Sequence, residues 1–187
     1  MNLTDYAWAA GFLDGEGSVS IIRHKPRCGV IKTGKRAGKV RRDPMTYQLI
    51  VSAVQINPDP IDRLVSLFAG VKSRVHRTGG KGDYWRWRIS SNQALAALEL
   101  MLPFFVGKTD VVRLAVGFQR YWSMSKSPTR VMAPERRAFA EHNWRECRRL
   151  NERYRYLKKS LLDSAEGRVL GWPASAETEQ AATGSGG

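Results

Sequence analysis

Two carboxylates near the N-terminus, Asp14 and Glu16, are the side chains best placed to do chemistry. They lie at the C-terminal end of a predicted helix that Thr4 begins as its N-cap and that stops at Gly15 and Gly17. The helix dipole disfavours an anion at this end by about 0.3–1 kcal/mol, so we expect a cation beside them. If the same helix of a second copy packed here, the two Glu16 carboxylates would adjoin. Such a pair is stable only when it is protonated or bridged by a divalent cation, and oxygen ligands favour magnesium over zinc.

The helix that carries these carboxylates has a stripe of small side chains. At helical spacing the stripe contains Ala7, Ala10, Gly11 and Asp14. Gly11 costs about 1 kcal/mol relative to alanine inside a helix, and the close approach of another helix is the commonest reason for such a glycine. We therefore predict that these four residues form a dimer interface. An ordinary core helix that ends in a glycine cap is the alternative at this point.

The composition indicates a polyanionic partner. The 187 residues include 31 Lys and Arg against 17 Asp and Glu, a net charge of +14, which favours nucleic acid over a membrane surface. No apolar run approaches the roughly 20 residues of a spanning helix, and no leader-like segment opens the chain, so we expect an intracellular, soluble protein. The two cysteines, Cys28 and Cys147, suggest neither disulfides nor a zinc finger.

Alternating patterns predict strands that could present polar side chains to DNA. Residues 18–25 and 46–55 place apolar side chains toward a core, and residues 71–77 and 84–89 form a second pair of strands. Arginine suits bidentate contact with guanine, and Arg86 and Arg88 share one face opposite Trp85 and Trp87. The predicted DNA-facing side chains of the strands are Ser20, Ile22, His24, Gln48, Ile50, Ser52, Lys72, Arg74, His76, Arg86 and Arg88.

The segment between the first two strands is basic and rich in glycine. Every charge from 25 to 42 is positive, which predicts a long hairpin tip that grips a phosphate backbone. A solvated loop is the alternative. The cations of this segment are Lys25, Arg27, Lys32, Lys35, Arg36, Lys39, Arg41 and Arg42.

The order of predicted elements indicates an α+β fold. Strand pairs alternate with helices in the order αββαββα(α), which predicts an antiparallel sheet with helices on one face and the other face free to bind a ligand. Residues 1–122 form the core unit in this prediction. Residues 123–165 form a basic helical appendage that either turns its basic side toward DNA or packs with that side solvated. Residues 166–187 form a disordered tail.

The first helix resembles the motif of the LAGLIDADG homing endonucleases, written here as Ala9-Ala10-Gly11-Phe12-Leu13-Asp14-Gly15-Glu16-Gly17. The resemblance extends over roughly residues 4–122 and implies that family's fold, a curved antiparallel sheet that forms a DNA-binding saddle. It implies that Glu16 and the adjacent Gly15 hold the metal, although Asp is usual at the position of Glu16. It also implies that Gln55 orders water and that Lys108, after the Leu-Pro-Phe turn, stabilises charge at the phosphate.

The resemblance therefore implies a magnesium-dependent endonuclease that cuts double-stranded DNA to leave short 3′ overhangs. The sequence contains one copy of the motif, so two chains are needed, and a homodimer would recognise a long, near-palindromic target. Two alternatives stay open on the same fold: an intron RNA-splicing maturase, for which RNA is the partner, and a non-catalytic DNA-binding regulator.

Overall fold

The computed structural model describes residues 2–25, 27–30, 38, 40–43, 45–76, 82–124 and 132–165. The chain divides into two compact units, Met1–Glu152 and Arg153–Gly187. This division differs from the predicted boundary after residue 122, because the last helix belongs to the first unit as far as Glu152. Residues 125–131 and the predicted tail at 166–187 lie outside the described residues.

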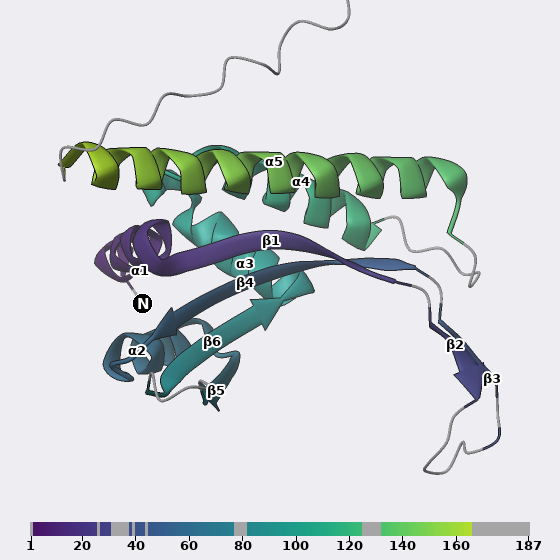
Figure 1. Cartoon of the computed structure of the whole chain (residues 1–187), viewed down its shortest axis with the longest axis horizontal. Helices are drawn as coiled ribbons and strands as arrows, with labels where there is room; N and C mark the ends of the chain where they lie inside the picture. The colour runs from purple at the N-terminus through teal and green to yellow at the C-terminus, as the bar shows by residue number, and fades with distance from the viewer. Residues whose placement is uncertain are drawn as a thin grey trace, which may run out of the picture. The chain divides into compact units, whose positions relative to one another are not determined.

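The helices and strands follow the predicted order, with one additional hairpin (Figure 1). The elements are α1 (Leu3–Glu16), β1 (Gly17–His24), β2 (Arg27–Val30), β3 (Val40–Asp43), β4 (Thr46–Gln55), α2 (Asp59–Phe68), β5 (Val71–Val75), β6 (Tyr84–Ser90), α3 (Ser91–Met101), the 3₁₀ turn η1 (Leu102–Phe104), α4 (Thr109–Met124) and α5 (Pro134–Ala165). None of the helices in this part of the chain combines the length and apolarity needed to cross a bilayer.

Four strands form one antiparallel sheet in the order β1-β4-β6-β5, and β2 and β3 form a separate two-stranded sheet. Alternation along each strand separates two faces of the larger sheet. The inner face packs on the helices through buried side chains such as Val19, Leu49 and Trp87. The predicted core alternation of β1, β4 and β6 is therefore confirmed.

The outer face of this sheet has a different chemistry. Register places its side chains in rows across the strands, for example Ser18–Ser52–Arg88. Among the positions described on β1, β4 and β6 this face carries no acidic side chain. Its members are Ser18, Ser20, Ile22, His24, Thr46, Gln48, Ile50, Ser52, Val54, Tyr84, Arg86, Arg88 and Ser90.

The first helix begins two residues earlier than predicted. Asn2, not Thr4, is its N-cap: the Asn2 side chain accepts a hydrogen bond from the Asp5 backbone N–H, and the Asp5 carboxylate accepts one from the Asn2 N–H. This capping box satisfies two of the backbone donors that a helix start leaves free. The Asp5 carboxylate also pairs with Arg63 of α2, which adds a tertiary contact to the cap.

The part of α5 within the first unit is anchored to the sheet through one carboxylate, Glu141. The Tyr47 hydroxyl donates to Glu141 Oε2 at 2.5 Å, and Arg23 Nη1 lies 2.9 Å from Glu141 Oε1. The Arg23 guanidinium also lies 4.0 Å from the ring centre of Trp144. Two turns after Trp144, Asn151 donates to the Val19 carbonyl at 3.0 Å, close to buried Cys147. These contacts favour the packing role for this part of α5.

The basic flank of α5 is neutralised along this part of the helix. Arg145 pairs with Glu141, Arg148 with Glu152, and Arg149 with Glu146 at 2.6 Å. Such exposed pairs contribute little stability, about 0.3–0.5 kcal/mol each. They do lower the net positive charge that this surface would present to DNA, which again favours packing over DNA contact for the flank as far as Glu152.

We expect Tyr47→Phe to lower the free energy of unfolding by about 1–3 kcal/mol, because Glu141 loses its buried donor. The hydrogen bond from Tyr47, followed by that from Arg23, holds the pKa of Glu141 below its ordinary value of 4.5. A lowered folded-state pKa stabilises the fold above the unfolded value, and this contribution is lost as pH falls through the lowered pKa. Burial and then Glu141 raise the pKa of Tyr47 to about 12, so the hydroxyl stays protonated at neutral pH.

Urea unfolding of the wild type and of Tyr47→Phe between about pH 7 and pH 3 checks this expectation. The variant should lose less stability on acidification than the wild type. Tyr121→Phe on α4 is the matched control, since Tyr121 is 42% exposed. Parallel pH curves for the wild type and Tyr47→Phe would contradict the role given to Glu141.

Candidate nuclease site

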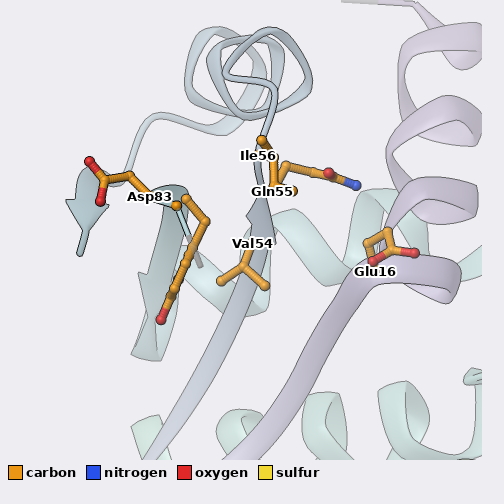
Figure 2. A pocket seen from close by; sticks show the side chains of 7 residues that line it. Glu16, Val54, Gln55, Ile56 and Asp83 are labelled. Atoms are coloured by element: carbon orange, nitrogen blue, oxygen red, sulfur yellow. The ribbon is translucent and has the colours of Figure 1, made fainter. Parts of the chain in front are cut away.

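The end of α1 and the ends of two central strands enclose a pocket of about 330 Å³. It brings together two of the predicted catalytic residues, Glu16 and Gln55 (Figure 2). The Gln55 side chain extends from the end of β4 toward Glu16, whereas Asp83 lies on the opposite side of the pocket from Glu16. The exposed Glu16 carboxylate and the half-buried Gln55 amide thus supply oxygen ligands and a hydrogen-bonding group to one space.

Several residues that line this pocket were missed by sequence reasoning. They are Val54, Ile56, Gly82, Asp83 and Tyr84. The register supplies the signal that could have found them, since Gln55 pairs with Trp85 and the pocket lies one step beyond this pair. Asp83 is engaged with β5, where its two carboxylate oxygens lie 2.8 Å from Arg74 and 2.8 Å from His76. The hydrogen bond from His76, followed by the charge of Arg74, lowers the pKa of Asp83 against the opposing effect of burial.

Lys108 provides the cation that the end of α1 requires. Its ammonium donates to the Leu13 carbonyl at 2.6 Å and to the Gly17 carbonyl at 2.7 Å. These two contacts satisfy carbonyls at the negative end of the helix. The Lys108 ammonium therefore contacts residues on either side of Glu16 in the sequence, but Lys108 is not among the residues that line the pocket. The structure places this lysine at the predicted end of the helix and gives it a helix-capping geometry.

Asp14 binds the loop that carries Lys108. Its carboxylate accepts backbone N–H bonds from Val106 at 2.8 Å, Gly107 at 3.0 Å and Lys108 at 2.8 Å. The predicted interface role of Asp14 is therefore wrong in this respect: the carboxylate is occupied within its own chain. Asp14 of α1 thus accepts hydrogen bonds from the segment before α4, and Lys108 of that segment donates hydrogen bonds to the end of α1.

We expect Asp14→Asn to destabilise the protein by about 1–2 kcal/mol, because an asparagine amide offers one oxygen, not two, to three N–H donors. The change leaves the shape almost constant, so the loss measures hydrogen bonding and charge. Chemical denaturation checks it, with Asp110→Asn at the exposed start of α4 as the control. Equal effects of the two substitutions would show that the three N–H bonds contribute little.

The exposed face of α1 differs from the predicted stripe. Ala10 is wholly buried in the core of its own chain, so its predicted interface role is wrong. Gly11 is exposed, and no atom of the described residues outside the helix backbone lies within 4 Å of where its Cβ would be. Gly15 is also exposed, and Ala7 is half-buried. The small residues available to a second helix are thus Ala7, Gly11 and Gly15, with the exposed Thr4 one turn before them.

All the predicted DNA-facing residues of β1, β4 and β6 lie on the outer face. Arg88 is exposed, Arg86 is half-buried, and His24 Nε2 lies 3.2 Å from Gln48 Oε1. Ile50 lies on this face but is only 3% exposed, so its side chain offers almost no surface to DNA. The cross-strand register places Ser20, Ile22 and Ser52 on the same face, beside these polar groups.

The predicted DNA-facing role of β5 is wrong. Register pairs Lys72 with Trp87 and Arg74 with Trp85, which puts both cations on the inner face. Lys72 forms an ion pair with Asp62 of α2, and Arg74 and His76 share Asp83. These side chains hold the edge of the sheet to its helix layer and its turn, and the structure offers none of them to the outer face.

The basic segment between β1 and β4 is described in part. Lys25 is exposed just after β1, and Arg27, Arg41 and Arg42 fall on the β2–β3 hairpin. The remaining predicted phosphate contacts, Lys32, Lys35, Arg36 and Lys39, lie outside the described residues. The β2–β3 hairpin lies between β1 and β4, in the segment where a long hairpin tip is predicted.

The metal-binding prediction depends on a second chain. Among the described residues, no three His, Cys, Asp or Glu side chains lie close enough to hold a metal ion. One chain contributes an exposed Glu16 carboxylate and the Gln55 amide, which are the hard oxygen ligands that magnesium prefers. The ligand chemistry therefore fits magnesium, and a second Glu16 would supply the missing charge.

Comparison with known proteins identifies the fold. No protein-family model matches the sequence, and no curated protein matches it. The structure is similar to the homing endonuclease I-CvuI in complex with its target in the presence of calcium, with a TM-score of 0.51 and 15% identity over 90% of this chain and 100% of that one. It also resembles the homing endonuclease I-TnaI (TM-score 0.47, 17% identity, 80% of this chain and 97% of that one). A third similar structure is the I-SmaMI LAGLIDADG homing endonuclease bound to cleaved DNA (TM-score 0.43, 18% identity, 67% of this chain and 38% of that one).

The I-CvuI comparison spans nearly the whole of both chains, so the chain has the LAGLIDADG homing endonuclease fold. The fold prediction, an antiparallel sheet with helices on one face, is confirmed.

Proposed function

We propose that this protein is a metal-dependent, site-specific DNA endonuclease that acts as a homodimer. The observation that carries the proposal is the pocket in which α1 presents Glu16 and β4 presents Gln55. This pocket lies at the end of α1, where the sequence carries its acidic motif, and beside the outer face of the sheet. On the described positions of β1, β4 and β6, this face carries arginines and no acidic side chain. The shared fold with a homing endonuclease that binds a target supports the same conclusion.

The reaction would be hydrolysis of a phosphodiester in each strand. Magnesium, held by Glu16 of both chains with the adjacent Gly15, would supply an activated water and neutralise phosphate charge. The Gln55 amide would orient the attacking water by hydrogen bonding. Lys108 would act as a positioning residue that fixes the end of α1 through the Leu13 and Gly17 carbonyls, in addition to its predicted charge near the phosphate.

Two copies would meet through the exposed face of α1. Within the described part of a single chain no contact explains a glycine at position 11, because a Cβ there has open space. A second helix that approaches at Ala7, Gly11 and Gly15 supplies the reason, and it brings the two Glu16 residues together. Two-fold symmetry then requires a near-palindromic target, read by the outer faces and held by the hairpin cations.

A cleavage selection on a randomised double-stranded DNA library, with magnesium or calcium in parallel reactions, tests this proposal. Magnesium-dependent cuts at one near-palindromic sequence, with short 3′ overhangs, are expected. Binding of duplex DNA without cutting under any metal would support the regulator. Tighter binding to structured intron RNA than to any duplex would support the maturase.

A further inference from the structure

None of the described residues that line the pocket beside Glu16 carries a positive charge. Among the described residues that line it, the charged groups are the acids Glu16 and Asp83. The Lys108 ammonium donates to the two carbonyls at the end of α1. A positive side chain at the substrate oxygens would add to the charge of the proposed metal, since negative charge gathers at these oxygens in the transition state.

Arg86 is connected to this pocket in two ways. Its Nη2 donates a long hydrogen bond, 3.3 Å, to the hydroxyl of Tyr84, a residue of the pocket lining. Its backbone pairs in register with Val54, another residue of the lining. The side chain therefore lies on the outer face at the edge of the pocket, and the Tyr84 hydroxyl restricts its orientation.

The sheet places Arg86 near the end of α1 at which Glu16 lies. Gly17, the residue after Glu16, pairs with Ala53, and Val54, the next residue of β4, pairs with Arg86 and lines the pocket together with Glu16. Two strand spacings separate β1 from β6, on the order of 10 Å. A phosphate and an extended arginine side chain together span such a distance. Within the described residues, no acidic side chain pairs with Arg86, so its charge is available to a ligand.

We infer that Arg86 is a further catalytic residue, which binds the phosphate at the scissile position, and that Tyr84 is its positioning residue. This inference rests on the proposed nuclease function. A planar guanidinium can bind two phosphate oxygens at once, and it strengthens its hydrogen bonds as their charge grows. Arg88, two residues further along the same strand, lies in the next row, Ser18–Ser52–Arg88, and so reaches a base edge rather than this phosphate.

The two arginines form a matched pair for the test. Each is changed to methionine, and binding is measured in a Glu16→Gln background that does not cut, while single-turnover cleavage is measured at saturating protein. Arg86→Met should lower the cleavage rate constant about 100-fold. It should weaken binding equally on all sequences and reduce the salt slope of binding by about 1. Arg88→Met should lose discrimination of about 10–100-fold at one base pair, with a much smaller fall in the rate constant.

Three further variants complete the experiment. Arg86→Lys keeps the charge without the planar fork and should recover part of the rate. Tyr84→Phe should lower the rate constant without altering base preference. Arg113→Met, at an exposed position of α4 on the helix side, controls for net charge. Thermal unfolding of each variant shows that the rate effects do not come from lost structure.

The outcomes separate the two proposals. A wild type that cuts and an Arg86→Met variant that cuts at the same rate would overturn the role of Arg86 alone. The same would follow if Arg86→Met and Arg88→Met lost the rate equally, or if Arg86→Met changed preference at one base pair. A wild type that binds DNA and cuts under no metal would overturn the nuclease and the Arg86 inference together.

Discussion

Glu16→Gln is expected to lower DNA cleavage by at least about 1,000-fold while the protein still folds and binds duplex DNA. The substitution removes the negative charge and keeps the size and shape of the side chain. Glu16 is exposed at the end of α1, so the core loses no contact. The loss should fall on the chemical step, because the metal site that we propose receives its charge from this carboxylate of each chain.

Single-turnover cleavage of the selected target and gel-shift affinity measure the two parts of this expectation. Glu99→Gln on α3 is the control, since it removes an exposed carboxylate on the opposite side of the sheet. Glu16→Asp keeps a carboxylate and should retain metal-dependent cutting. Cleavage by Glu16→Gln at the rate of the wild type would exclude Glu16 as the metal ligand and with it the proposed active site.

Gly11→Leu is expected to convert the dimer to a monomer and to abolish double-strand cleavage. Among the described residues of the isolated chain, no atom outside the helix backbone lies within 4 Å of a Cβ at this position, so the first carbon of a leucine side chain meets open space. A two-fold interface contains the substitution twice, and overpacking costs about 1–3 kcal/mol at each site, so association should weaken by a factor of roughly 30 or more. Leucine also has a higher helix propensity than glycine, so α1 itself should not be weakened.

Sedimentation equilibrium of Gly11→Leu and of the wild type gives the association state directly. Gly117→Leu is the matched control: Gly117 is an exposed glycine inside α4, and a Cβ there likewise meets nothing within 4 Å. The control should leave association unchanged. A stable, active Gly11→Leu dimer would contradict the interface proposed for α1.

Periodicity in the sequence was sufficient to predict the sheet faces of three strands. Val19 and Ile21, or Trp87 and Ile89, alternate with polar residues, and each of these apolar side chains is buried as expected. The same reasoning failed for Lys72 and Arg74. Their alternation is real, but the face on which it falls is set by pairing with Trp87 and Trp85, which no local pattern contains.

The position of a site residue was predictable from the sequence where it depends on the end of a helix or strand. It was less predictable where contacts with distant parts of the chain determine whether the side chain is free. Glu16 is the last residue of α1 and Gln55 is the last residue of β4, and both line one pocket. Asp14 and Ala10 look alike at helical spacing. One is occupied by N–H groups of residues 106–108 and the other is buried by the core, and both partners come from distant parts of the chain.

The junction between α1 and β1 contains no loop: the helix ends at Glu16 and the strand begins at Gly17. A Cβ at Gly17 would lie 2.6 Å from the Leu13 side chain and 2.7 Å from its backbone, so only glycine permits this direct turn. In the proposed dimer, the pairing helix and the DNA-reading sheet therefore move as one body. The distance between the two DNA-reading sheets of the dimer is then fixed, and it sets the separation of the two half-sites that the dimer can bind. In a target lengthened by one base pair, about 3.4 Å, the second half-site would lie out of reach of its sheet.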